Sequence, residues 1–207
     1  MADQLVDLRD DAAYAEYLRR EQCARWKSLI GSRLPYRWNI RRLKPGFTLE
    51  IGCGIGRYLT YLGGHGVGVD RNAAAVGVAR DRGLMAYTSD EWPASPYAVP
   101  GMFDALLAAH VLEHMSEADA LGLVDSYLPY VRAGGRVILI TPQERAFASD
   151  PTHVEFLDLP ALTTLCGKLD LNLERACSFP FPRRLGPLFT GNEFVVAARV
   201  PQGTGSS

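Results

Sequence analysis

At 207 residues, the chain has the length of one domain and is long enough to bury a full hydrophobic core. Its 47% hydrophobic and 22% charged residues are typical of a globular protein, and its formal net charge of −1 excludes a general attraction to nucleic acid or acidic membranes. No apolar run reaches the length of a membrane span, no secretory signal is expected, and four scattered cysteines indicate neither a zinc site nor disulfides, so a cytoplasmic location is expected.

The first 45 residues are predicted to form an N-terminal helical lid. Apolar residues recur at helical spacing between positions 14 and 30, which predicts one or two amphipathic helices. A basic stretch without acids follows, interleaved with aromatics: Arg33, Tyr36, Arg37, Trp38, Arg41, Arg42 and Lys44. We favour a solvated helix face anchored by its aromatics, and a lid whose basic residues meet an anionic or polyhydroxylated substrate is the alternative. Residues 46–200 are assigned to the core and residues 201–207 to a disordered tail.

A strand, a glycine turn and a helix are predicted between Phe47 and Tyr61. The turn reads Glu50-Ile51-Gly52-Cys53-Gly54-Ile55-Gly56, and such a turn lets backbone N–H groups approach a ligand at a helix N-terminus. Asp70 ends the next apolar run, where a carboxylate can accept hydrogen bonds from a ribose diol. An ordinary strand–helix turn stays open as an alternative. A nicotinamide fingerprint would need glycine at position 57, which is Arg57 here.

The rest of the chain alternates strands with helices. Further strands are predicted at residues 84–88, 103–109, 136–141, 172–178 and 192–200. Further helices are predicted at residues 72–82, capped by Asn72, at 116–131, capped by Ser116 with Asp119, and at 159–169. A proline-rich loop at 93–101 replaces one crossover helix. This alternation predicts an α/β fold, a doubly wound and mostly parallel sheet with helices on both faces and an antiparallel last strand pair. Its ligand would bind at the carboxyl ends of the strands.

Two further motifs complete a family resemblance. The stretch at residues 103–114 ends in Val111-Leu112-Glu113-His114, and Arg132-Ala133-Gly134-Gly135 leads into the fifth strand. Together with the glycine turn and its leading acid, these motifs resemble class I S-adenosylmethionine (SAM) methyltransferases of small molecules, and more weakly sugar or hydroxyl O-methyltransferases of that fold. The resemblance spans residues 47–142 well and the last two strands more loosely. It implies a single seven-stranded sheet with one reversed strand.

The resemblance also implies which residues bind SAM. Glu50 and the backbone of the turn would hold the methionine portion, Asp70 the ribose hydroxyls, and His110 would line the methionine end. Asp90, with Ser89 beside it, would lie near the adenine amino group, and Arg57 could reach the carboxylate of SAM. The full set of implied cofactor residues is Glu50, Gly52, Cys53, Gly54, Gly56, Arg57, Asp70, Arg71, Ser89, Asp90 and His110.

Two polar groups follow the fourth and fifth strands and are candidates for catalysis. A neutral hydroxyl acceptor needs a base or a metal to take its proton. His153, in Asp150-Pro151-Thr152-His153, is a candidate base or a structural histidine; His114 is a second candidate; Glu113 fits a helix cap better than a catalytic group. Alternatively, His114, Asp150 and His153 could hold Mg²⁺. His110-x-x-Glu113-His114 also matches the motif of inverted zinc proteases. We reject this interpretation, because the motif here ends a buried strand instead of lying along a helix.

The absence of two motifs limits which class of molecule can accept the methyl group. The chain has no Asn/Asp-Pro-Pro-Tyr for a planar amine and no cysteine pair for a covalent pyrimidine mechanism. A small hydroxylated molecule such as a sugar is therefore the first choice, with Arg183 and Arg184 as rim contacts or as plain surface arginines. N-methylation, RNA methylation, a non-catalytic SAM-binding module and a nicotinamide oxidoreductase are the alternatives. The oligomeric state is left open, with a homodimer among the options.

Overall fold

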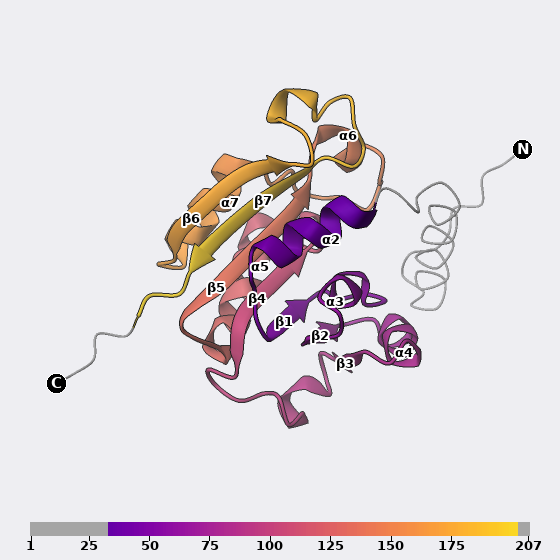
Figure 1. Ribbon diagram of the computed structural model, residues 1–207, viewed down its shortest axis with the longest axis vertical. Helices are drawn as coiled ribbons and strands as arrows, with labels where there is room; N and C mark the ends of the chain where they lie inside the picture. The colour runs from indigo at the N-terminus through magenta and orange to yellow at the C-terminus, as the bar shows by residue number, and fades with distance from the viewer. Residues whose placement is uncertain (1–32, 203–207) are drawn as a thin grey trace, which may run out of the picture.

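A single seven-stranded sheet forms the centre of the molecule, which the computed structural model describes for residues 33–202 (Figure 1). The strands lie in the order β3-β2-β1-β4-β5-β7-β6. Their bounds are β1 Thr48–Ile51, β2 Gly66–Asp70, β3 Met85–Thr88, β4 Phe103–Ala109, β5 Val131–Pro142, β6 Asn172–Phe179 and β7 Glu193–Arg199. Strands β1 to β5 pair in parallel, and β7 is antiparallel to both β5 and β6. The predicted fold class, including the single reversed strand, is confirmed.

Helices cover both faces of this sheet. Their bounds are α2 Arg33–Arg42, α3 Arg57–Tyr61, α4 Ala73–Asp81, α5 Glu117–Tyr127, α6 Glu144–Phe147 and α7 Leu159–Lys168. In Figure 1, α2 crosses in front of the sheet and α5 and α7 lie behind it. Among these helices, all within residues 33–202, none is long and apolar enough to cross a membrane.

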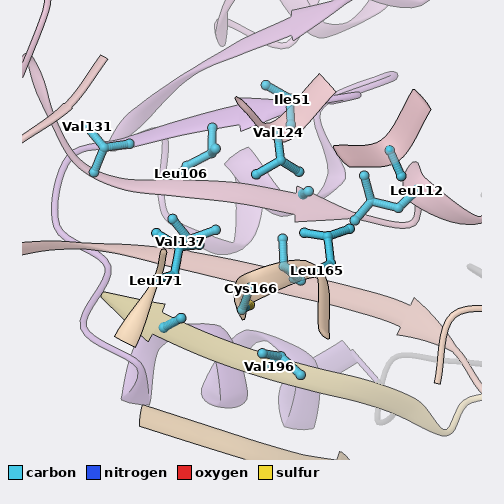
Figure 2. Packing of buried hydrophobic residues seen from close by; sticks show 14 of the residues in the cluster. Ile51, Leu106, Leu112, Val124, Val131, Val137, Leu165, Cys166, Leu171 and Val196 are labelled. Atoms are coloured by element: carbon cyan, nitrogen blue, oxygen red, sulfur yellow. The ribbon is translucent and has the colours of Figure 1, made fainter. Parts of the chain in front are cut away.

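The alternation of side chains along β4 divides the core between the two faces. Leu106 packs with Val124 of α5 and Leu165 of α7 in the largest buried cluster, part of which Figure 2 shows. Leu107 points to the other face and joins a second cluster with Ile40 of α2 and Tyr58 of α3. Because β4 is apolar on both faces, it reads as the continuous apolar run expected of a buried parallel strand.

Side-chain caps begin three helices. Asn72 Oδ1 accepts from Ala75 N at 2.8 Å and Ser116 Oγ accepts from Asp119 N at 3.2 Å, which confirms both predicted caps. Asp158 Oδ1 caps α7 through Ala161 N at 3.0 Å, and this cap was not predicted.

The largest deviation from the predicted elements is the start of β5. The predicted helix to residue 131 ends earlier, at Tyr127, and a 3-10 turn that contains Pro129 follows it. Strand β5 then begins at Val131 rather than Arg136, because Val131 already pairs with Phe103 before an irregularity in the register. Gly134, with φ 70°, lies inside this irregular segment. The short helix α6 was not predicted either.

Most of the predicted N-terminal lid lies outside the described residues, as does most of the predicted tail, so the lid remains a prediction. Within the described part, Tyr36 and Trp38 contact the ring of Phe179, with centroids 5.8 and 6.3 Å apart. Arg41 Nε donates to Tyr61 O at 3.0 Å, and Arg42 lies 4.5 Å over the Trp38 ring. These contacts show aromatic anchoring of the kind expected for a solvated helix face, and the exposed Arg37, Arg41 and Arg42 leave the alternative of a substrate-facing lid as a prediction.

Candidate active site

The glycine turn follows β1 and can only be built from glycine at its key positions. Gly52, Gly54 and Gly56 have φ values of 67°, 50° and 78°, a region that other residues rarely adopt. A Cβ on Gly52 would lie 2.3 Å from Val111 Cγ2, and one on Gly56 would lie 2.3 Å from Leu84 Cδ1. The backbone of the turn is therefore in direct contact with the segment that follows β4.

The N–H groups of the turn are used differently from the prediction. Gly52 N and Cys53 N donate to Val69 O at 2.8 and 3.1 Å, Gly56 N donates to Cys53 O at 2.9 Å, and Gly54 N donates to an Asp70 carboxylate oxygen at 2.7 Å. Helix α3 has only five residues, so its dipole adds little. These four N–H groups therefore already donate within the protein. What the turn offers a ligand is a backbone without side chains, which the ligand can approach closely.

Asp70, the last residue of β2, lies against this turn. Its Oδ2 accepts from Gly54 N at 2.7 Å and its Oδ1 from Asn72 N at 2.8 Å. A carboxylate is a hydrogen-bond acceptor, the property needed to bind the hydroxyls of a ribose. Ser89 N donates to Asp70 O at 3.0 Å, so the exposed Ser89 and Asp90 follow directly beside it, and Arg71 is exposed on its other side.

Cys53 is 4% exposed and fills the space under the turn, where a Cβ on Gly68 would lie 2.6 Å from its sulfur. Burial raises the pKa of the Cys53 thiol well above its usual range. The side chain of Cys53 therefore packs under the turn, and only its backbone could contact the cofactor as the resemblance implies.

Glu50 is a buried carboxyl group beneath the turn. It is 1% exposed, and its Oε2 accepts from Leu59 N at 3.0 Å, which ties β1 to α3. Burial raises the pKa of Glu50 to about 8, despite the opposing effects of Arg57 and of the hydrogen bond from Leu59. The group is therefore largely neutral at pH 7 in the free protein.

His110 stands at the end of β4 in a network that includes an unpredicted residue, Glu193. His110 has φ 55°, uncommon outside glycine and often found at functional sites. Its Nε2 lies 2.8 Å from Glu193 Oε1, to which the Tyr58 hydroxyl donates at 3.0 Å. Burial lowers the pKa of His110, but the carboxylates of Glu113 and Glu193 outweigh this and raise it to about 8. Arg57 lies beside the network, 5.0 Å over the Tyr58 ring.

Glu193 was missed because no motif surrounds it. It opens β7 in the sequence Glu-Phe-Val-Val-Ala-Ala-Arg, 83 residues after His110. The one signal in the sequence was an acidic residue at the start of a mostly apolar strand. In the structure Glu193 is only 6% exposed, which is unusual for a glutamate.

The second polar group lies beyond His110, where the segment after β5 meets the 3-10 turn Leu112–His114. Val154 N donates to Glu113 O at 2.7 Å, which holds the two segments together. The rings of His114 and His153 lie 4.9 Å apart. His153 also stacks on Phe147 of α6, with ring centroids 5.1 Å apart.

One ligand-type atom from each of Glu113, His114 and His153 lies within 4.8 Å of the others. Asp150 lies beside this group: its Oδ1 accepts from Thr152 N and Oγ1 at 2.9 and 2.6 Å, and its Oδ2 is 3.9 Å from His153 Nε2. The metal set predicted from the sequence, His114, Asp150 and His153, therefore differs by one carboxylate from the group that the structure brings together.

The predicted rim arginines behave as surface residues. Arg183 pairs with Glu144 of α6 and lies 5.0 Å over the Phe194 ring, and Arg184 is exposed. Neither residue joins the cluster of Glu113, His114 and His153.

Replacing Asp70 with alanine is expected to weaken SAM binding at least about tenfold. A hydrogen bond to a charged group contributes roughly 1.5–3 kcal/mol, and the variant also loses the bonds that hold Gly54 and Asn72. Calorimetric titration with SAM measures the effect, with Asp125→Asn on the exposed face of α5 as the control for a lost charge. Unchanged affinity in Asp70→Ala would remove the ribose assignment.

Comparisons with known proteins agree with this fold. A family model described as a methyltransferase domain matches residues 14–197, while no curated protein sequence matches the chain. A SAM-dependent methyltransferase from Thermotoga maritima superposes with a TM-score of 0.68 at 17% identity, covering 90% of this chain and 97% of that one. A chain from the complex of the Haloferax volcanii Trm112 activator with a methyltransferase superposes with a TM-score of 0.67 at 13% identity. The match covers 93% of this chain and 98% of that one. Magnesium protoporphyrin IX methyltransferase from Synechocystis, solved with bound SAM, superposes with a TM-score of 0.54 at 14% identity. The match covers 97% of this chain and 86% of that one.

Proposed function

The chain belongs to the methyltransferase-domain family, and we propose that this SAM-dependent methyltransferase transfers the methyl group to a hydroxyl of a small molecule. The observation that carries the proposal is the continuity of the site. Gly52 of the cofactor turn lies against Val111, His110 Nδ1 lies 3.4 Å from Glu113 Oε1, and Glu113 Oε1 lies 4.0 Å from His153 Nε2. Groups that can accept a proton thus begin immediately beside the cofactor turn.

The turn and Asp70 fit SAM through their shape and acceptors. Backbone with positive φ and no side chain permits close approach, and the carboxylate of Asp70 at the end of β2 is an acceptor of the kind that binds ribose hydroxyls. When bound, SAM supplies a methyl group on a sulfonium that leaves as a neutral thioether, S-adenosylhomocysteine.

The residues around His153 would handle the proton of the acceptor. A neutral hydroxyl is a weak nucleophile, so the chemistry needs a group that takes its proton as the new oxygen–carbon bond forms. The ring nitrogen Nδ1 of His153 lies 2.8 Å from Phe147 O, to which it donates, and this leaves Nε2 with a lone pair. Nε2 is the proton acceptor in this proposal, and the nearby carboxylates of Glu113 and Asp150 would stabilise the imidazolium that results.

A sugar or another polyol is the acceptor class that this site supports best. Two imidazoles and two carboxylates within a few ångströms are hydrogen-bonding groups for several neighbouring hydroxyls. An RNA acceptor is supported less well, because Arg41 and Arg42 of the basic stretch are engaged by the protein itself. Mg²⁺, the ion suggested by the sequence, prefers oxygen ligands and would find only one carboxylate in the three-residue cluster.

A panel of sugars, phenols and amines, incubated with the protein and SAM, tests the proposal. We expect S-adenosylhomocysteine to form with hydroxyl acceptors and mass spectrometry to show a methyl ether. Product with amines alone would overturn O-methylation in favour of N-methylation. A chain that binds SAM but forms no S-adenosylhomocysteine with any acceptor would be the non-catalytic module instead.

A further inference from the structure

We propose that Glu113, His114 and His153 bind a divalent transition-metal ion of the Zn²⁺ or Mn²⁺ type at the carboxyl end of β4. One donor atom from each side chain lies within 4.8 Å of the other two. The three residues come from two segments, the turn Leu112–His114 and the loop after α6, which the 2.7 Å bond from Val154 N to Glu113 O fixes together. The proposal rests on the proposed function and deepens it, because the ion would sit where the acceptor hydroxyl is activated. With the ion bound, His153 Nε2 would be a ligand, and the Asp150 carboxylate, whose Oδ2 lies 3.9 Å from it, would take the hydroxyl proton instead.

The first argument is the state of the Glu113 carboxylate. Its side chain is 0% exposed, and within residues 33–202 neither of its oxygens has a hydrogen-bond partner. His110 Nδ1 lies 3.4 Å and His153 Nε2 4.0 Å from the carboxylate, and neither makes a hydrogen bond to it. His110 also lies 2.8 Å from Glu193, so the charge of a protonated His110 is shared by two carboxylates. A buried carboxylate is strongly destabilising unless hydrogen bonds or a cation offset its desolvation, and a bound dication would do so.

The second argument is the orientation of the histidines. His153 Nδ1 donates to Phe147 O at 2.8 Å, so its Nε2 carries the lone pair. The Thr152 hydroxyl donates to Asp150 Oδ1 at 2.6 Å, so its oxygen can only accept from His114 Nδ1, 3.1 Å away. His114 Nε2 is then the unprotonated nitrogen as well. Metal-binding histidines typically give their other N–H to a carbonyl or a carboxylate-linked group in this way.

The third argument is the spacing of the donor atoms. Nitrogen and oxygen ligands lie about 2.1 Å from such an ion, so two ligands of one ion are at most about 4.2 Å apart. His153 Nε2 and Glu113 Oε1, at 4.0 Å, are too far apart for a hydrogen bond and fall within this limit. The three donor atoms lie within 4.8 Å of one another, so the side chains would draw together by about half an ångström to share one ion. Asp150 is not one of the three ligands. Its Oδ1 accepts from the Thr152 hydroxyl, whose oxygen in turn accepts from His114 Nδ1 and so orients that ring.

The chemistry of the donors selects the class of ion. Two imidazole nitrogens with one carboxylate suit Zn²⁺, Mn²⁺, Fe²⁺ or Co²⁺, whereas Mg²⁺ prefers oxygen. Three protein ligands leave at least one coordination position for an oxygen of the acceptor. An ion there would lower the pKa of a bound hydroxyl and favour its loss of a proton.

Direct binding to the full-length protein, after dialysis against EDTA, tests the proposal without any acceptor. Titration with Zn²⁺ and Mn²⁺ is expected to show one site per chain with a micromolar or lower Kd for at least one ion. Co²⁺ is expected to give a visible absorption spectrum typical of nitrogen ligation. Failure of the wild-type protein to bind any of the three ions tighter than about 100 μM would overturn the proposal, whatever the variants do.

Variants locate the ion. Glu113→Gln and His114→Ala are each expected to weaken binding at least about tenfold. His65→Ala, which removes a histidine outside the cluster, is the matched control and should bind as the wild-type protein does. Equal binding by all variants would indicate an adventitious surface ion only and would overturn the site. Methyl transfer that persists in EDTA would overturn the role of the ion while leaving the proposed methyltransferase activity standing.

Discussion

The Glu50→Gln variant is expected to be more stable than the wild-type protein at pH 8.5, by roughly 3–5 kcal/mol, and about equally stable at pH 5. Burial raises the pKa of Glu50 to about 8, against about 4.5 for the unfolded chain. Between these values the folded protein holds a proton that the unfolded chain does not. The stability that depends on this proton is therefore fully present below pH 4.5 and is lost as the pH rises to 8.

Urea unfolding of both proteins at several pH values, without cofactor, measures this difference. Glutamine keeps an oxygen that can accept from Leu59 N, so the link between β1 and α3 should survive. Asp125→Asn on the exposed face of α5 is the control for the change in overall charge. If wild-type protein and Glu50→Gln lose stability in parallel between pH 5 and 8.5, Glu50 is not held neutral in the folded state.

A carboxyl group that destabilises the free protein at neutral pH is informative about function. Residues that conflict with stability tend to lie at functional sites, and Glu50 lies directly beneath the glycine turn. The resemblance to class I methyltransferases assigns it to the methionine end of SAM. A cationic ammonium group bound nearby would favour the ionised form of Glu50, so the same group could contribute to binding.

The parts of the fold that the sequence predicts are those with local signals. Strand β4 is a continuous apolar run, and both Asn72 and Ser116 cap helices within three residues of themselves. The glycine turn is recognisable because Gly52 and Gly56 occupy conformations that exclude side chains. Each of these features is decided by neighbouring residues in the chain, which a single sequence displays directly.

The parts that could not be predicted depend on distant partners. Glu193 belongs to the site only because β7 returns beside β5 and brings its carboxylate to His110 and Tyr58. The early start of β5 likewise depends on the pairing of Val131 with Phe103. The only local sign of the first contact is one acid at the start of a mostly apolar strand, and this sign does not identify its partners.

The cluster of Glu113, His114 and His153 was predicted only in part. The sequence identified His114, Asp150 and His153 as polar residues at the correct end of the sheet, because each follows a strand. It could not distinguish a capping Glu113 from a buried one, since the difference arises when Val154 and Glu155 close over the turn through Glu113 O. The complete burial of the Glu113 side chain makes it a member of the cluster.

Replacing His153 with alanine is expected to reduce turnover by about 100-fold or more while SAM affinity stays within about threefold of the wild-type value. His153 Nε2 lies 4.0 Å from Glu113 Oε1 and 3.9 Å from Asp150 Oδ2, and neither of these partners is among the cofactor residues implied by the sequence. Its loss removes the proton acceptor, or a ligand of the proposed ion, without touching the cofactor residues. Initial rates of S-adenosylhomocysteine formation and calorimetry with SAM measure the two effects separately.

The His153→Asn variant separates chemistry from structure at the same position. An asparagine amide can still donate to Phe147 O, as Nδ1 does at 2.8 Å, but it has no counterpart of Nε2. A structural histidine would therefore tolerate asparagine much better than alanine, whereas a base or ligand would tolerate neither. We expect both variants to be similarly inactive and His65→Ala to be fully active, because only the lone pair on Nε2 can take a proton or bind an ion at this place. An active His153→Asn protein would assign the histidine to the packing of α6 and would move the search for the base to His114.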